Sequence, residues 1–155
     1  MRLANKKVLL RADFNVPISK NGDILDDYRI RKTLPTIEHI IGSGASLGII
    51  AHLGRPKNGY DKKLSLEPVA KKLQDLLHKP VIFAPDCIGT QAKEVWANKP
   101  NDAIVLFENV RFYNQELTND DDFAAQLADG FDIFVQDAFG DVHRKHASVE
   151  AITHY

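Results

Sequence analysis

The chain has 155 residues, 44% of them hydrophobic and 26% charged, which is enough for one sizeable core and too few for two ordinary domains. Its 20 lysines and arginines and 21 aspartates and glutamates leave a formal net charge of -1, which argues against partners drawn by a general positive field, such as nucleic acid or an anionic membrane surface. The single cysteine excludes an internal disulfide, no apolar run approaches the roughly 18 residues of a membrane span, and the N-terminus lacks a secretory signal, so we expect a globular cytoplasmic protein.

Short apolar runs alternate with amphipathic stretches along the chain, a pattern that favours parallel βαβ units. We expect five strands, at residues 7–14, 46–52, 80–84, 103–108 and 131–139. The alternation predicts a three-layer α/β/α, Rossmann-like domain with a mostly parallel sheet.

The first expected helix carries apolar residues at helical spacing from Ile30 to Ile41 and closes at Gly42. Pro35 lies inside this pattern, and a proline within a helix loses a hydrogen bond and crowds the preceding turn. The helix is therefore expected either to start near Thr33 or to bend there.

Three further helices are predicted from their end signals. Ser65 is the expected N-cap of the second helix, and the third occupies residues 90–97. The fourth begins at the acidic run 119–122, where negative charge complements the helix dipole, and ends at Gly130. After Asp141 no closing helix or strand is evident, which is typical of the cut end of a larger protein or of a mobile tail.

Two motif interpretations fail on physical grounds. Gly54 and Gly59 have the spacing of a phosphate-binding P-loop, but Tyr60 and Asp61 replace the required lysine and hydroxyl residue. A His-x-x-His pair near the C-terminus is too weak a pattern for a metal site, and we expect hydrogen-bonding histidines and no metal there.

Arginines follow several of the predicted strands. Arg29, Arg55, Arg111 and Arg144 each stand just beyond a strand or in the loop after one. Loops at the carboxyl ends of parallel strands converge on one crevice, so these guanidinium groups could meet a shared anion. The sequence therefore predicts a site for a small phosphorylated or carboxylated substrate.

Other polar residues accompany the arginines. Strand alternation places Arg11, Asp13 and Asn15 on one side, where the last two could receive substrate hydroxyl groups. An equally good alternative is that Asp13 pairs with Arg11 or caps the turn held by Pro17. After the second strand, Gly54 permits close backbone approach to a ligand beside Arg55.

Together these residues resemble the N-terminal domain of the phosphoglycerate kinase family. The resemblance rests on five segments in order over nearly the whole chain: VLLRADFNVP, DYRIRKTLPTI, HLGRP, ENVRF and DAFGDVHRKHAS. It implies that residues 1–155 form a substrate-binding domain, incomplete at its C-terminus, of a kinase whose separate C-terminal domain holds Mg-ATP or Mg-ADP, with no cofactor site in this chain.

The resemblance also implies roles for individual residues in the glycolytic transfer of a phosphoryl group between ATP and 3-phosphoglycerate, which yields 1,3-bisphosphoglycerate. Arg29 would contact the reacting carboxylate and the phosphoryl group during its transfer. The remaining implied substrate contacts are Asp13, Asn15, His52, Arg55, Arg111, Gly140 and Arg144. We expect a monomer that binds substrate without turning it over.

The chain departs from the family pattern NDAFGTAHRAHSS at several points near its fifth strand. Asp141 is the most consequential, because a carboxylate beside a phosphate-binding arginine could pair with it and weaken the anion site, with Lys145 offsetting the added charge. Two alternatives therefore stay open: a stand-alone phosphate-ligand-binding module without catalysis, and a structural domain whose anion site has decayed.

Overall fold

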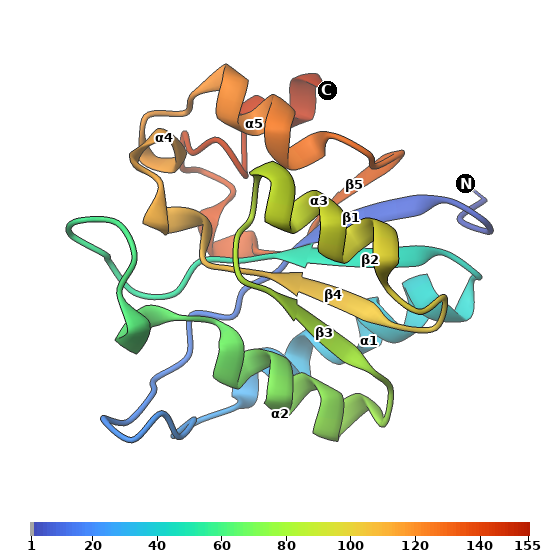
Figure 1. Ribbon diagram of the computed structural model, residues 1–155, viewed down its shortest axis with the longest axis horizontal. Coiled ribbons are helices and arrows are strands. Elements are labelled where there is room, and N and C mark those ends of the chain that lie inside the picture. Colours follow the sequence, from blue (N-terminus) through green and yellow to red (C-terminus); the bar gives the residue numbers. More distant parts are fainter. Residues whose placement is uncertain (1) are drawn as a thin grey trace.

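The computed structural model describes residues 2–155, which form a five-stranded sheet with helices on both faces (Figure 1). The strands are β1 (Lys7–Arg11), β2 (Ser46–Ile50), β3 (Val81–Ala84), β4 (Ile104–Phe107) and β5 (Ile133–Gln136). They lie in the order β3-β4-β2-β1-β5, and every neighbouring pair is parallel. The expected α/β fold is confirmed.

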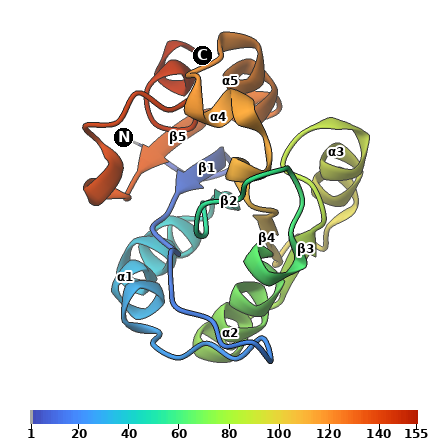
Figure 2. The same cartoon turned by 90° about the vertical axis from the view of Figure 1, so that its left-hand side faces the viewer.

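The helices are distributed according to the direction of each crossover. α1 (Tyr28–Gly42) and α2 (Glu67–Leu77) cover one face, while α3 (Gly89–Asn98) and α5 (Asp121–Ala128) cover the other (Figure 2). The connections from β1 to β2 and from β2 to β3 run in one direction across the sheet. The connections from β3 to β4 and from β4 to β5 run in the opposite direction. Because such crossovers are right-handed, a reversal of direction moves the connecting helix to the opposite face.

Several short helices were not expected from the sequence. They are α4 (Asn114–Leu117) and the 3-10 helices η1 (Lys62–Leu64), η2 (Val110–Phe112), η3 (Phe139–Asp141) and η4 (Ala151–His154). They are too short to show the apolar periodicity from which helices are predicted.

Side-chain alternation along the strands divides the core into two parts. Val8 and Leu10 of β1 belong to the part that includes α1 and α2, and Leu9 belongs to the part that includes α5. Both faces of the strand are buried, as expected of a parallel sheet covered on both sides.

Four strands end earlier than expected. Their last residues are Arg11, Ile50, Phe107 and Gln136, instead of residues 14, 52, 108 and 139. Beyond these points, side chains replace neighbouring strands as hydrogen-bond partners of the backbone. Asp13 Oδ1, for example, accepts from the Asn15 N–H at 3.3 Å. Two of the expected ligand contacts, Asp13 and His52, are among the residues released from the sheet in this way.

α1 begins at Tyr28 and continues across Pro35, so the first of the two alternatives, a start near Thr33, is wrong. The Thr33 hydroxyl donates to the carbonyl of Arg29 at 3.0 Å, within the turns that precede the proline. Burial of Ile30 and Ile37 on one face holds the helix against the sheet.

α2 begins at Glu67, so Ser65 is not its N-cap residue as the helix is defined. The Ser65 hydroxyl still accepts from the Glu67 N–H at 3.2 Å, and the Glu108 carboxylate accepts from the Leu66 N–H at 2.9 Å. A carboxylate from the end of β4 therefore shares the capping of this helix.

The segment after Asp141 is packed, contrary to the expectation of a chain without a closing helix. It ends in η4, where Ala151 and Ile152 are buried in the cluster that contains α5. The Ile152 N–H donates to the Ala147 carbonyl at 2.9 Å. In residues 2–155, no helix has the length and apolar character needed to cross a membrane.

Candidate anion-binding site

The loops after β1, β2, β4 and β5 surround an open cavity of about 290 Å³ beyond the carboxyl ends of the strands. All eight expected ligand contacts line it: Asp13, Asn15, Arg29, His52, Arg55, Arg111, Gly140 and Arg144. Gly54 and Asp141 complete the lining. The structure thus brings the predicted residues together at the edge of the sheet where α/β proteins bind ligands.

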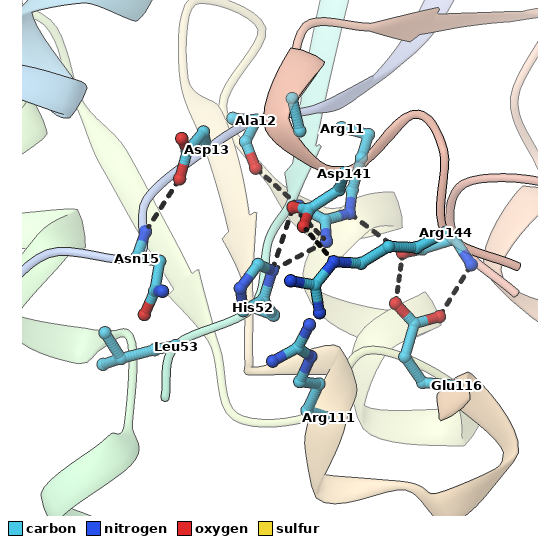
Figure 3. A network of polar contacts seen from close by, with 12 residues as sticks. Arg11, Ala12, Asp13, Asn15, His52, Leu53, Arg111, Glu116, Asp141 and Arg144 are labelled. Carbon is cyan, nitrogen blue, oxygen red and sulfur yellow. Dashed lines mark hydrogen bonds and ion pairs between the residues drawn. The ribbon is translucent and has the colours of Figure 1, made fainter. Parts of the chain in front are cut away.

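His52 lies in the wall of the cavity and is 4% exposed. The Arg11 Nη2 atom contacts its Nδ1 atom at 2.8 Å (Figure 3). Because a guanidinium can only donate, Nδ1 must accept, and the neutral ring carries its proton on Nε2. Burial, together with the positive charges of Arg11, Arg111 and Arg144, lowers the pKa of His52 to about 2. His52 is therefore a neutral hydrogen-bond donor.

Arg111 brings a largely buried positive charge to the cavity. The residue is 8% exposed, its Nη1 atom donates to the Gly54 carbonyl at 3.1 Å, and its Nε atom is buried without a hydrogen-bond partner. Within residues 2–155, no carboxylate lies within 4.0 Å of it. Desolvation lowers the pKa of Arg111, although an arginine stays protonated at neutral pH. An anion in the cavity would stabilise this charge.

One wall of the cavity is held by Asp13, Asn15 and Arg29. Arg29 Nη1 lies 3.4 Å from Asp13 Oδ1 and donates to the Asn15 carbonyl at 2.9 Å. The contact between Asp13 and the Asn15 N–H is the turn-capping alternative considered above, whereas an ion pair with Arg11 does not form. The contacts of Asp13 with residues 2–155 use Oδ1, and its second carboxylate oxygen has no hydrogen-bond partner among them.

Arg55 and Arg144 are exposed residues at the mouth of the cavity. Arg144 Nε lies 3.5 Å from Asp141 Oδ1, and the other oxygen of that carboxylate lies 3.7 Å from Arg11 Nη2. Arg55 forms no ion pair with any residue from 2 to 155.

Gly54 joins the two sides of the cavity through its backbone. Its N–H donates to Asn15 Oδ1 at 2.9 Å, and its carbonyl accepts from Arg111. Its φ angle is +62°, and a Cβ atom there would lie 2.7 Å from Leu64 Cδ2. The positive φ favours glycine at this position, and a larger residue would also require the end of the Leu64 side chain to move.

A buried polar network beneath the cavity was missed by the sequence reasoning. Arg11 is fully buried, and its Nε atom donates to the Ser148 hydroxyl at 2.9 Å. The Ser148 N–H donates to the buried Glu116 carboxylate at 2.7 Å, and this carboxylate also accepts from the Ser148 hydroxyl. The alternation predicted for this segment continues beyond the end of β1, because Ala12, Phe14 and Val16 stay in the core cluster of α1 and α2. Arg11 lies in the buried network, whereas Asp13 and Asn15 line the cavity.

The sequence feature that could have indicated this network is the arginine inside the apolar run VLLRA, because a charged residue in a buried strand requires polar partners. Nothing local identifies those partners: Ser148 lies 137 positions from Arg11, and Glu116 lies 32 positions from Ser148.

Two other observations concern possible ligand sites elsewhere in the domain. An apolar crevice lined by Trp96, Phe107 and Phe131 has a volume of only about 30 Å³, close to that of one water molecule. In the part of the chain that the structure describes, no three His, Cys, Asp or Glu side chains are grouped so as to hold a metal ion.

The parallel sheet and its arginine-lined cavity define an α/β domain suited to binding a small anion. The sequence model of one family, described as "PGK: Phosphoglycerate kinase", matches residues 1–155. The chain therefore belongs to the phosphoglycerate kinase family.

Individual relatives agree with this assignment. The chain is 48% identical to a phosphoglycerate kinase from Koribacter versatilis, with 100% of this chain and 40% of the relative covered, and 50% identical to one from Synechococcus sp., with 99% and 38% covered. The phosphoglycerate kinase structure from Coxiella burnetii matches with a TM-score of 0.82 at 40% identity, and that from Pyrococcus horikoshii with 0.83 at 32%. These structural matches cover 100% and 96% of this chain, and 38% of each known structure. The chain spans about two fifths of the length of these relatives.

Proposed function

We propose that the cavity binds 3-phosphoglycerate and that the chain forms the N-terminal, substrate-binding domain of a phosphoglycerate kinase. The observation that carries this proposal is the convergence of four arginines, one of them the buried and unpaired Arg111, on a cavity of about 290 Å³. The four arginines outnumber the two carboxylates of the lining, and a three-carbon acid that bears one phosphate and one carboxylate would supply further negative charge.

The chemistry of the lining residues suggests an orientation for the substrate. Its phosphate is expected near Arg55, Arg111 and Arg144, with the Nε2–H of His52 as a neutral donor and the Gly140 backbone close by. The free oxygen of Asp13 would accept a hydrogen bond from the substrate hydroxyl.

The proposed reaction belongs to the longer kinase. A carboxylate oxygen of 3-phosphoglycerate forms a bond to the γ-phosphorus of ATP, while the bond from that phosphorus to the β,γ-bridging oxygen breaks and leaves ADP. No protein nucleophile is needed, because catalysis depends on alignment and on neutralising the phosphoryl oxygens. Arg29 is the proposed source of that neutralising charge, and its side chain is 49% exposed toward solvent.

The nucleotide and its magnesium ion are expected on a separate domain. The two substrates would then meet only after the domains close, and closure would exclude water from the phosphoryl group.

An amide NMR titration of the 155-residue chain tests the binding proposal. Addition of 3-phosphoglycerate should shift the resonances of Asp13, Arg55, Arg111 and Gly140, and addition of Mg-ATP alone should shift none of them. A dispersed spectrum whose resonances do not shift on addition of 3-phosphoglycerate would contradict the proposal and favour a decayed anion site.

The role proposed for Arg29 is tested in the kinase that contains this chain. Arg29→Ala should lower kcat by about 10³-fold or more, with a much smaller change in KM, because its charge acts mainly on the transition state. Arg31→Ala is the matched control: Arg31 lies on the same helix, pairs with Asp27 at 2.9 Å and does not line the cavity, so both constants should be unchanged. Equal losses of affinity and turnover in Arg29→Ala would refute the assigned role.

A further inference from the structure

The cavity contains a negative charge of its own, on Asp141. This side chain is 11% exposed and lines the same cavity as the arginines (Figure 3). Its carboxylate lies 3.5 Å from Arg144 Nε and 3.7 Å from Arg11 Nη2. Because His52 is neutral, the 3.5 Å separation between its Nδ1 atom and the carboxylate is not an ion pair. Asp141 therefore acts on the two arginines.

The two carboxylates divide the arginines of the cavity into paired and unpaired groups. Asp13 lies 3.4 Å from Arg29, and Asp141 is the partner of Arg144. Arg55 and Arg111 have no carboxylate within 4.0 Å in residues 2–155. Two uncompensated guanidinium groups match the charge of one phosphate dianion.

We propose that Asp141 is an internal counter-anion that limits the affinity of the cavity for phosphate-bearing ligands and determines how strongly it prefers dianions. This inference rests on the proposed function, because it concerns the same cavity. In the free protein, the carboxylate stabilises Arg11 and Arg144; when a ligand binds, it competes for Arg144 and repels the incoming negative charge.

The local backbone keeps Asp141 in this position. It belongs to η3, its N–H donates to the Ala138 carbonyl at 2.9 Å, and its own carbonyl accepts from the Arg144 N–H at 2.9 Å. These bonds fix the backbone, and the contacts with Arg11 and Arg144 hold the carboxylate in the lining, so a ligand would share the cavity with it. A unit charge a few ångströms away in a partly solvated site changes affinity by about tenfold.

The test compares Asp141→Asn with the wild-type chain. The amide keeps the shape of the side chain and removes its charge. Calorimetric titration at one pH and ionic strength should give an approximately tenfold lower Kd for inorganic phosphate and for 3-phosphoglycerate. Asp129→Asn is the control: Asp129 is an exposed carboxylate that pairs with Lys93 at 2.7 Å and does not line the cavity, so its removal should leave both affinities unchanged.

A second comparison distinguishes the effect of the Asp141 charge on the ligand from an effect of the altered side-chain shape. The gain in Asp141→Asn should be larger for sulfate, a dianion, than for methyl sulfate, a monoanion of similar form. Asp141→Ser should show the same preference, and it provides a second variant if the asparagine protein unfolds.

The outcomes distinguish the two proposals. If both proteins bind 3-phosphoglycerate equally, or if the variant binds more weakly, Asp141 is not a competing anion, although the proposed function stands. If neither protein binds any of these anions, both proposals are wrong.

Discussion

At the scale of single residues, the candidate site depends on which groups carry charge. His52 stands among arginines and would be repelled as a cation, whereas its neutral ring accepts from Arg11 on one side and offers a proton to the cavity on the other. Arg111 has the opposite character, because it keeps its charge without a carboxylate partner. The site thus combines a neutral donor with a cation that a bound anion would stabilise further.

The depressed pKa of His52 makes stability depend on pH. In the unfolded chain, His52 titrates near 6.5, whereas in the native protein it stays neutral down to about pH 2. The unfolded state therefore binds more protons below pH 6.5, and the free energy of unfolding falls as the pH falls. Between pH 7.5 and pH 5.0, His52 should account for about 2 kcal/mol of that loss.

Urea unfolding at these two pH values checks this expectation. In His52→Gln, the difference in unfolding free energy between pH 7.5 and pH 5.0 should be smaller than in the wild type by about 2 kcal/mol. His39→Gln alters an exposed histidine on α1 and should leave the difference as it is. An unchanged difference in His52→Gln would show that this ring is protonated in the folded protein.

Arg111 should display a conflict between stability and binding. Arg111→Met replaces a buried, unpaired cation with an apolar side chain, so the free energy of unfolding should fall by less than about 1 kcal/mol or should rise. Phosphate affinity should fall by about 30-fold or more, since a charge-assisted bond to phosphate is lost. Chemical unfolding and calorimetric titration of the same protein measure the two effects. A loss of stability above about 3 kcal/mol would contradict the description of Arg111 as unpaired.

At the scale of elements, Glu108 joins the end of β4 to the start of α2. Its carboxylate accepts from the Ser65 hydroxyl at 2.7 Å, from the Leu66 N–H at 2.9 Å and from the Asn109 N–H at 2.9 Å. Glu108 is 4% exposed, so water cannot readily replace it as acceptor. The loop after β4, which carries Arg111, and the first turn of α2 therefore share one acceptor group.

Removal of this carboxylate should destabilise the domain. Glu108→Ala leaves buried donors without partners and should lower the free energy of unfolding by about 2–4 kcal/mol, while Glu108→Gln, which keeps one acceptor oxygen, should have a smaller effect. Glu67→Ala, at an exposed position in the first turn of the same helix, should change stability by less than about 0.5 kcal/mol. Equal values for Glu108→Ala and Glu67→Ala in urea unfolding would exclude the capping role.

At the scale of the whole molecule, topology creates the cavity. The strands are parallel, so the loops that follow them lie at one edge of the sheet. The reversal of crossover direction after β3 places α1 and α2 on one face and α3 and α5 on the other, so these loops lead to opposite faces and leave a cavity between them. The net charge of -1 supplies no general attraction for anions, and the positive character of the cavity comes from this convergence alone.

Anion binding should stabilise the entire fold, and Cys87 is a probe for this effect. The thiol is 5% exposed and lies outside the cavity, and burial raises its pKa, so it should react with a thiol reagent mainly when the chain unfolds. Phosphate at ten times its Kd should slow the labelling of Cys87 by about tenfold. Reaction of the native chain at the rate of the denatured chain would show that this thiol is not protected by the fold.

The sequence alone determined the class of fold and most members of the candidate site. Apolar runs of strand length mark all five strands to within a few residues, because a buried parallel strand is apolar on both faces. Once the strands are assigned, the rule that parallel strands place their carboxyl ends at one edge brings Asp13, His52, Arg55 and Arg111 together. These predictions succeed because they depend on local pattern and on a geometric property of parallel sheets.

Only the tertiary structure decided how the charges of the site are paired. Arg11 has its acceptors at Ser148 and, through it, at Glu116. Asp141 pairs with Arg144, as the sequence allowed, and it also lies 3.7 Å from the buried Arg11, which the sequence did not predict. The early strand ends were likewise not predicted, and of the two alternatives for α1 the start near Thr33 was wrong. Such pairings depend on distances between side chains from different loops, and local propensity and periodicity contain no information about those distances.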